Sequence, residues 1–187
     1  MDVTLSWNLF IGVFFLIIVA YSFVIGKSQT MKVILSSYMA ILAADGAGNL
    51  LQTYFFGADP VLKVLVVQTD STGFILLKIS IFVFLTVLLT TRGAFHIELH
   101  QDQSKFISLF LTGAYGIMSA ALTISTILVY ISGVSILGAS AVLAESPIVS
   151  IAEQSSLVRT MVENYSLWFA LPAVVFTFSS LFARGEE

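Results

Sequence analysis

The segment ILAADGAGNLLQTYF, residues 41–55, raises the central question about how this chain folds. It lies in an apolar run long enough to cross a membrane, yet Asp45 stands near its middle. Asn49 and Gln52 follow at intervals of four and three residues, so all three side chains share one helix face. A carboxylate near the centre of a bilayer costs about 3 kcal/mol on insertion scales. Asp45 must therefore face protein, water or a cation.

The composition places the whole chain in a membrane. Of its 187 residues, 58% are hydrophobic and only 10% are charged, and the mean hydropathy is +1.00. A soluble domain has roughly 25% charged residues, so this chain has too few polar side chains to cover a water-facing surface. It contains no cysteine, which excludes disulfides and cysteine-ligated metals. The small net charge of −3 and the lack of a basic cluster argue against a nucleic-acid partner.

The apolar runs predict an all-α integral membrane protein with about four transmembrane helices and a C-terminal amphipathic or interfacial segment. The polar segment GKSQTMK, residues 26–32, is expected to be a turn between the first two spans. We expect a transmembrane domain over residues 1–140 and the C-terminal segment over 141–187. The four predicted spans are Leu5–Ile25, Val33–Phe56, Gly73–Thr91 and Phe106–Leu137.

The C-terminal segment has two parts. Ser146 and Pro147 resemble an N-cap followed by proline at the first helical position. The apolar residues after them recur near a period of 3.6, which indicates an amphipathic helix lying on the membrane. The final apolar run, Leu167–Phe182, is short and is expected to be broken by Pro172. It fits a fifth span, a re-entrant piece or an interfacial helix, and we favour the last.

The basic residues of the short loops indicate an orientation. The expected alternation of four spans puts the loop that contains the histidines on the same side as four basic residues, and only two basic residues on the other side. Because cytoplasmic loops are enriched in lysine and arginine, the N-terminus is expected outside and the histidine loop inside. The first group is Lys27, Lys32, Arg92 and Lys105, and the second is Lys63 and Arg159.

Lys78, in the third predicted span, is the expected partner of Asp45. An antiparallel neighbouring helix would bring the two side chains within reach. One interpretation is an ion or proton step in which Asp45 titrates after desolvation, with Asn49 and Gln52 lining a wet path. The other is a structural ion pair, or a lysine that reaches back to the interface. We favour the structural interpretation.

The fourth span carries a ridge of small residues. Thr112, Gly116 and Ala120 recur every four residues, with Gly113 beside them. Small side chains let helix backbones approach closely in membranes. The ridge is therefore predicted to pack against a helix of the same chain or of a second copy.

The stretch HIELH, His96–His100, is the one candidate for a metal site. It differs from the HExxH zinc motif because its glutamate lies midway between the histidines. A zinc site needs three or four ligands, so His96 and His100 alone do not make one, and a solvated loop is the favoured interpretation. We predict no cofactor, and no catalytic arrangement indicates an enzyme.

Three segments resemble the colicin V production protein (CvpA) family. They are YSFVIGKSQTMKVILSSYMAILAA, KFISLFLTGAYGIMSAALTISTILVY and EQSSLVRTMVENYSLWFALP, and together they cover 70 of the 187 residues, in the family's order. The first resembles the family's first loop and second helix, with a glycine turn that flows directly into the next helix. The second resembles its last membrane helix, and the third its C-terminal portion. Lys27 stands where the family usually has arginine.

The resemblance implies a bacterial inner-membrane protein that supports colicin V production or export. It transfers no catalytic residues. Three functions are therefore weighed: an accessory protein of toxin export or envelope homeostasis, an ion- or proton-conducting oligomer that uses Asp45, and, least favoured, a membrane enzyme. The partners expected are the lipid bilayer and either a second copy of the chain or another membrane protein.

Overall fold

The computed structural model describes residues 6–55, 71–93, 105–133, 136, 151 and 155–182. Within these residues the chain is all-helical, as the sequence predicts, and contains no strand. The helices are α1 (Trp7–Phe55), α3 (Ser71–Arg92), α4 (Lys105–Ile131), α6 (Ser156–Glu163) and α7 (Tyr165–Phe182). The predicted features at His96, His100 and Ser146–Pro147, together with the side chain of Gln52, lie outside the described part.

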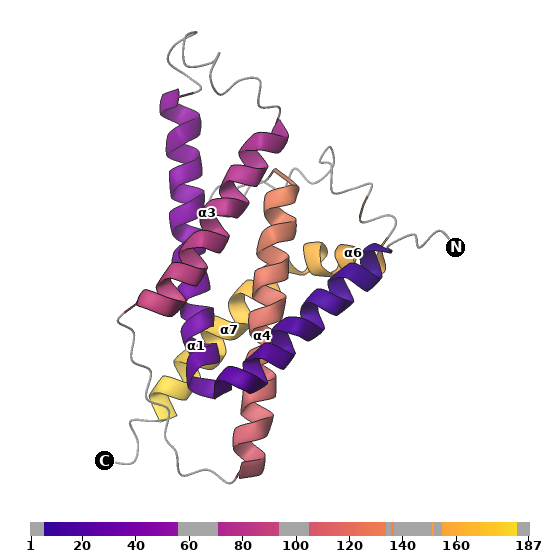
Figure 1. Cartoon of the computed structure of the whole chain (residues 1–187), viewed down its shortest axis with the longest axis vertical. Coiled ribbons are helices and arrows are strands. Elements are labelled where there is room, and N and C mark those ends of the chain that lie inside the picture. Colours follow the sequence, from indigo (N-terminus) through magenta and orange to yellow (C-terminus); the bar gives the residue numbers. More distant parts are fainter. Residues whose placement is uncertain are drawn as a thin grey trace.

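The first two predicted spans form one long element, α1, which bends sharply at Gly26 (Figure 1). Gly26 has φ 78° and ψ 171°, a conformation that is essentially restricted to glycine. The expected polar turn over 26–32 is therefore wrong, because this single residue changes the chain direction and the next residues are already helical. Thr30 Oγ1 donates to the Gly26 carbonyl oxygen at 2.9 Å, which satisfies an acceptor at the bend.

Three helices are long and apolar enough to cross a membrane, and α6 with α7 make a fourth if that bent pair is one span. The apolar stretch of α1, Trp7–Leu51, has 45 residues, or about 68 Å of helix. That is more than twice the thickness of the hydrocarbon core, roughly 30 Å, so α1 is too long for a single straight span. The bend at Gly26 divides it into a first half, residues 7–25, and a second half, residues 27–55. The finding supports a multi-pass membrane protein.

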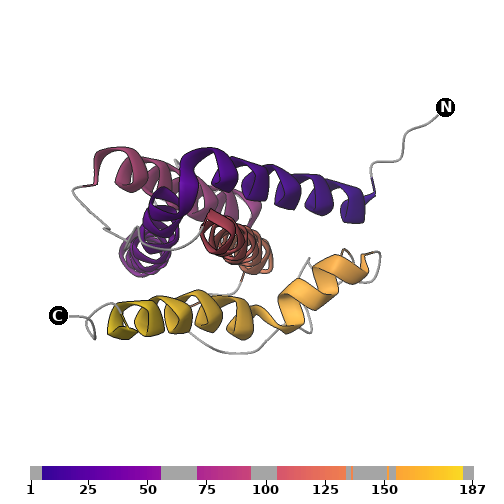
Figure 2. The same ribbon diagram turned by 90° about the horizontal axis from the view of Figure 1, so that it is seen from below.

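Helix α4 is the centre of the bundle. In an apolar stretch of 18 residues of α4, 72% is buried inside the protein, against 11% in the corresponding stretches of α1 and α3. Figure 2 shows α4 nearly end-on, between α1 on one side and α6 with α7 on the other. Helix α4 ends at Ile131, earlier than the predicted Leu137. Helices α1 and α3 therefore leave most of their apolar residues exposed, as is expected of faces that contact lipid.

The predicted small-residue ridge of α4 packs within the chain, close to the bend of α1. A Cβ atom on Gly116 would lie 2.9 Å from Ser22 Cβ, and one on Gly113 would lie 3.2 Å from Phe23 Cζ. Ala120 is fully buried, and Thr112 is buried with its hydroxyl donating to a carbonyl of its own helix. This part of the ridge therefore lets α4 approach the first half of α1.

The C-terminal arm is bent by 61° between α6 and α7. The bend lies at Asn164, the C-cap of α6. The expected break at Pro172 is wrong, because α7 continues through that residue. Proline lacks an N–H and displaces carbonyls of the preceding turn, and in that turn the Phe169 carbonyl accepts a hydrogen bond from Tyr38 Oη. This contact ties α7 to the second half of α1.

Ser155 caps α6 and also joins it to the start of α1. Its hydroxyl accepts from Val158 N–H at 3.2 Å and donates to Asn8 Oδ1 at 2.6 Å. Replacing Ser155 by alanine removes both interactions. We expect a loss of about 1 kcal/mol in the free energy of unfolding, measured by denaturant titration in micelles. Substituting the neighbouring exposed Leu157 by alanine is the control, and an equal loss there would contradict a capping role.

Candidate functional site

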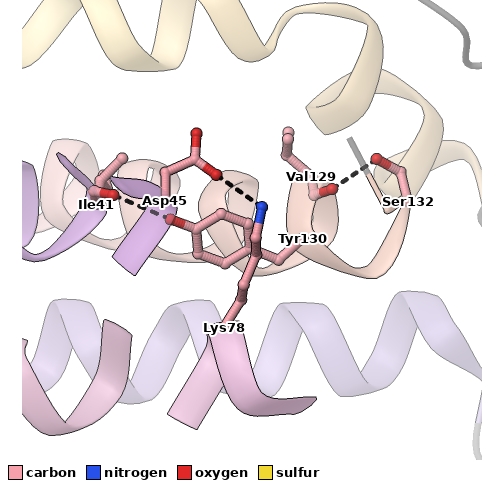
Figure 3. A network of polar contacts seen from close by, with 6 residues as sticks. All are labelled: Ile41, Asp45, Lys78, Val129, Tyr130 and Ser132. Atoms are coloured by element: carbon pink, nitrogen blue, oxygen red, sulfur yellow. Dashed lines mark hydrogen bonds and ion pairs between the residues drawn. The ribbon is translucent and has the colours of Figure 1, made fainter. Parts of the chain in front are cut away.

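The centre of the site is a buried ion pair between α1 and α3. Lys78 Nζ donates to Asp45 Oδ1 at 3.0 Å. The side chain of Asp45 is fully buried, and that of Lys78 is only 6% exposed. Figure 3 shows the lysine reaching from α3 to the carboxylate, with the Tyr130 ring beside it. The two opposite charges compensate one another away from water, which removes most of the cost of burying either one alone.

The pair forms because α3 lies antiparallel beside the second half of α1. The second half of α1 and α3 run in opposite directions side by side (Figure 1). Asp45 lies in the later turns of α1, and Lys78 lies in the second turn of α3. Residues near the end of one helix therefore meet residues near the start of the next. This is the antiparallel contact that the sequence predicts for the two side chains.

Aromatic rings complete the surroundings of the lysine. Lys78 Nζ lies 5.2 Å from the centre of the Phe74 ring and 5.9 Å from that of Tyr130. At such distances a ring face attracts a cation. Tyr130 Oη donates to the Ile41 carbonyl at 3.2 Å, and its ring meets Phe82 edge-on. Tyr130 thus connects the ion pair to α4.

Sequence reasoning missed Phe74 and Tyr130. A signal for Phe74 was present, since it stands four residues before Lys78 and so shares its helix face. Tyr130 had a weaker signal, a single hydroxyl near the end of an apolar helix. Its place beside Lys78 depends on how α4 packs, which no local pattern contains.

Gly48 provides the space in which the lysine stem lies. A Cβ atom at this position would overlap Lys78 Cε and would lie 3.1 Å from Cγ. Gly48 belongs to the small-residue stretch AADGAG, and its close neighbour is the side chain of Lys78. The absence of a side chain at Gly48 therefore permits the ion pair.

Replacing Gly48 by alanine should displace the lysine and weaken the pair. We expect a loss of about 1–3 kcal/mol in the free energy of unfolding, as for overpacking of a closed core. Denaturant titration in micelles measures it. Gly46→Ala is the matched control, because a Cβ there meets no atom within 4 Å. Equal stability of the two variants would contradict this role for Gly48.

The structure describes only one of the remaining predicted polar residues in full. Asn49 is half-buried on α1, one turn after Asp45. Gln52 also belongs to α1, but its side chain is among those not described, as are His96 and His100. Among the described residues, no group of three or more His, Cys, Asp or Glu side chains could hold a metal ion.

The arrangement can do two things chemically. As a closed pair it fixes the contact between α1 and α3, because separating the charges inside the bundle is costly. If the lysine moves away, the carboxylate becomes able to accept a proton or another cation. The first role needs no motion of the helices, and the second needs the pair to open.

Comparison with known proteins identifies no similar protein. The chain matches no protein-family model, no curated protein and no solved structure. Function must therefore be argued from the residues and their geometry.

Proposed function

We propose that this chain is an accessory protein of the bacterial inner membrane, of the colicin V production type, which supports toxin production or export, or envelope homeostasis. The observation that carries the proposal is the packing of the three segments behind the resemblance. They correspond to the region around the bend of α1, to α4 and to the arm formed by α6 and α7. Helix α4 contacts both other segments. Segments that are separate in sequence thus make one structural unit.

The detail at the bend supports the same proposal. The resemblance implies a glycine turn that leads directly into a second helix, and Gly26 with its positive φ is such a turn. The spaced glycines of the second segment pack there, with Gly116 against Ser22 and Gly113 against Phe23. Glycines of α4 that pack against residues just before a glycine bend are a reason for both motifs to occur in one chain.

The charges favour an orientation with this bend in the cytoplasm. Lys27 and Lys32 follow the bend, Arg92 ends α3, and α4 begins at Lys105. These helix ends lie toward the lower part of Figure 1. Because basic residues are retained on the cytoplasmic side, this orientation puts the N-terminus outside. The opposite orientation would place these four basic residues on the translocated side.

A deletion strain of the encoding bacterium tests the accessory role. Envelope permeability to a large antibiotic and the secretion of a reporter peptide toxin are measured with and without the gene. We expect deletion to raise permeability or to lower secretion. A plasmid that carries the wild-type gene should restore whichever of the two has changed. Gly26→Ala should restore poorly, whereas Gly12→Ala should restore fully, because a Cβ at Gly12 meets nothing within 4 Å. Unchanged permeability and secretion in the deletion strain would refute the proposal.

Ion or proton conduction by an oligomer is the second candidate. Its specific support is Asp45, a carboxylate buried between two helices that can span the membrane. Intramembrane ionisable residues commonly belong to ion or proton pathways. Proton flux into liposomes is compared for wild type and for Asp45→Asn/Lys78→Met, which removes both charges together. Flux that is lost in the variant supports conduction, and no flux in either protein refutes it.

A further inference from the structure

Four buried hydroxyl groups on α1 and α3 behave differently from the others in the bundle. Several hydroxyls within the spans donate to a carbonyl of the preceding turn, as Ser22, Thr112 and Thr126 do. In contrast, four hydroxyl oxygens have no hydrogen-bond partner among the described residues although they are buried. They belong to Ser36, Ser37, Thr86 and Thr90.

These hydroxyls occur only on the two helices that carry the ion pair. Ser37 lies eight residues before Asp45 on α1, and Thr86 lies eight residues after Lys78 on α3. The two helices run antiparallel, so eight residues backward along α1 and eight residues forward along α3 cover the same distance in the same direction. Ser37 and Thr86 therefore both lie about 12 Å from the ion pair, toward the Gly26 end of the bundle. Ser36 and Thr90 extend the set by at most one further turn. The four groups thus lie on one side of the pair.

A buried hydroxyl without a partner costs about 1–3 kcal/mol, so four of them in one helix pair require an explanation. Water is the ligand that satisfies such groups, since it can accept from a hydroxyl and donate to a nearby helix carbonyl. Ser36 and Ser37 are both fully buried. The four hydroxyls are themselves uncharged, and the nearest charged residues along the two helices are Lys32, four residues before Ser36, and Arg92, two residues after Thr90.

Apolar side chains separate these hydroxyls from the ion pair. Phe82 lies midway between Lys78 and Thr86 on α3, and Ile41 lies midway between Asp45 and Ser37 on α1. Both are almost fully buried, and the Phe82 ring is held by its edge-on contact with Tyr130. Apolar side chains that close a constriction can gate water in membrane proteins.

We propose that Ser36, Ser37, Thr86 and Thr90 bind water between α1 and α3, and that Phe82 separates this hydrated layer from the Asp45–Lys78 pair. The layer places water about two helical turns from the carboxylate, on the cytoplasmic side in the orientation proposed above. Displacement of Phe82 would then give Asp45 a source of protons. The hydration itself does not depend on conduction, so its test is separate from the flux assay.

X-ray hydroxyl-radical labelling of the full chain in nanodiscs, in water enriched in ¹⁸O, tests the hydrated layer. Radicals formed from bound water oxidise adjacent aromatic rings, so we expect ¹⁸O on Phe82 despite its burial. In the variant Ser36→Ala/Ser37→Ala/Thr86→Val/Thr90→Val the labelling should fall at least threefold. Thr126→Val is the matched control and should leave Phe82 labelling unchanged, because that hydroxyl already has a carbonyl partner. An unlabelled Phe82 in the wild type would overturn the proposal.

Thermal unfolding of the same variants gives an independent readout that needs no labelling. If the hydroxyls bind water, their removal should leave Tm unchanged or lower it. A rise of several degrees in the fourfold variant would mean that dry, unpaired hydroxyls had been removed, and would overturn the proposal. Ser37→Ala and Thr86→Val should also give non-additive Tm shifts if the two groups share water, and strictly additive shifts would show that they do not form one layer.

Discussion

Replacing Lys78 by methionine should destabilise the folded protein by about 3–5 kcal/mol. This is the range for removing one partner of a buried ion pair, because the remaining charge is left uncompensated. Here the remaining group is the fully buried Asp45, which must either stay ionised in the interior or take up a proton. Denaturant titration of the purified protein in micelles measures the change in the free energy of unfolding.

The double variant Asp45→Asn/Lys78→Met separates the charge from the packing. It removes both charges and keeps side chains of similar size, so it should recover most of the stability lost in the single variant. If the double variant is as unstable as Lys78→Met, the loss comes from the lysine stem against Gly48 and the aromatic rings rather than from the carboxylate. Recovered folding also makes this variant the appropriate one for the flux assay.

Replacing Gly26 by alanine should have the second large effect. An L-residue in this φ/ψ region costs about 1–3 kcal/mol, and Gly26 is at φ 78°, ψ 171°. If the chain instead relaxed toward continuous helix, the two halves of α1 would straighten and the contacts of Gly113 and Gly116 with the first half would be lost. The free energy of unfolding in micelles measures the first consequence. The distance between spin labels at the exposed positions Leu16 and Leu42, one on each half of α1, measures the second.

The matched control for the bend is Gly12→Ala. Gly12 lies in the first half of α1, has helical backbone angles, and a Cβ there meets no atom within 4 Å. Alanine is a better helix former than glycine by about 1 kcal/mol, so this variant should be as stable as wild type or more so. A Gly26→Ala variant that also gained stability and kept the wild-type distance between the two labels would contradict the role of the bend.

Much of the ion-pair site could be predicted from the sequence, and the reason is local. Asp45 and Lys78 are charged residues inside apolar runs, and a charge in such a place needs a partner within the protein. Two successive antiparallel helices offer few candidates, so the pair could be named from the chain alone. Its aromatic neighbours could not be found this way, since Tyr130 reaches the lysine only through the packing of α4.

Two boundary predictions were wrong for reasons of geometry. Lys27–Lys32 were expected in a turn because they are polar, yet Gly26 alone turns the chain and leaves them free to be helical. Pro172 was expected to end a helix, yet α7 passes through it, and Tyr38 donates to a carbonyl of the preceding turn. In both cases a contact or a single backbone conformation outweighed the local propensity.

The sequence by itself determined the all-helical membrane class, the positions of the long apolar helices and the need of Asp45 for a partner. These follow from composition, from run length and from the cost of charge in lipid, all of which are properties of single segments. The tertiary structure decided that α4 is central, that Gly48 makes room for Lys78, and that four buried hydroxyls on α1 and α3 have no hydrogen-bond partner within the described part of the chain. Those features depend on which side chains meet across helices, and such distances are set only when the whole bundle packs.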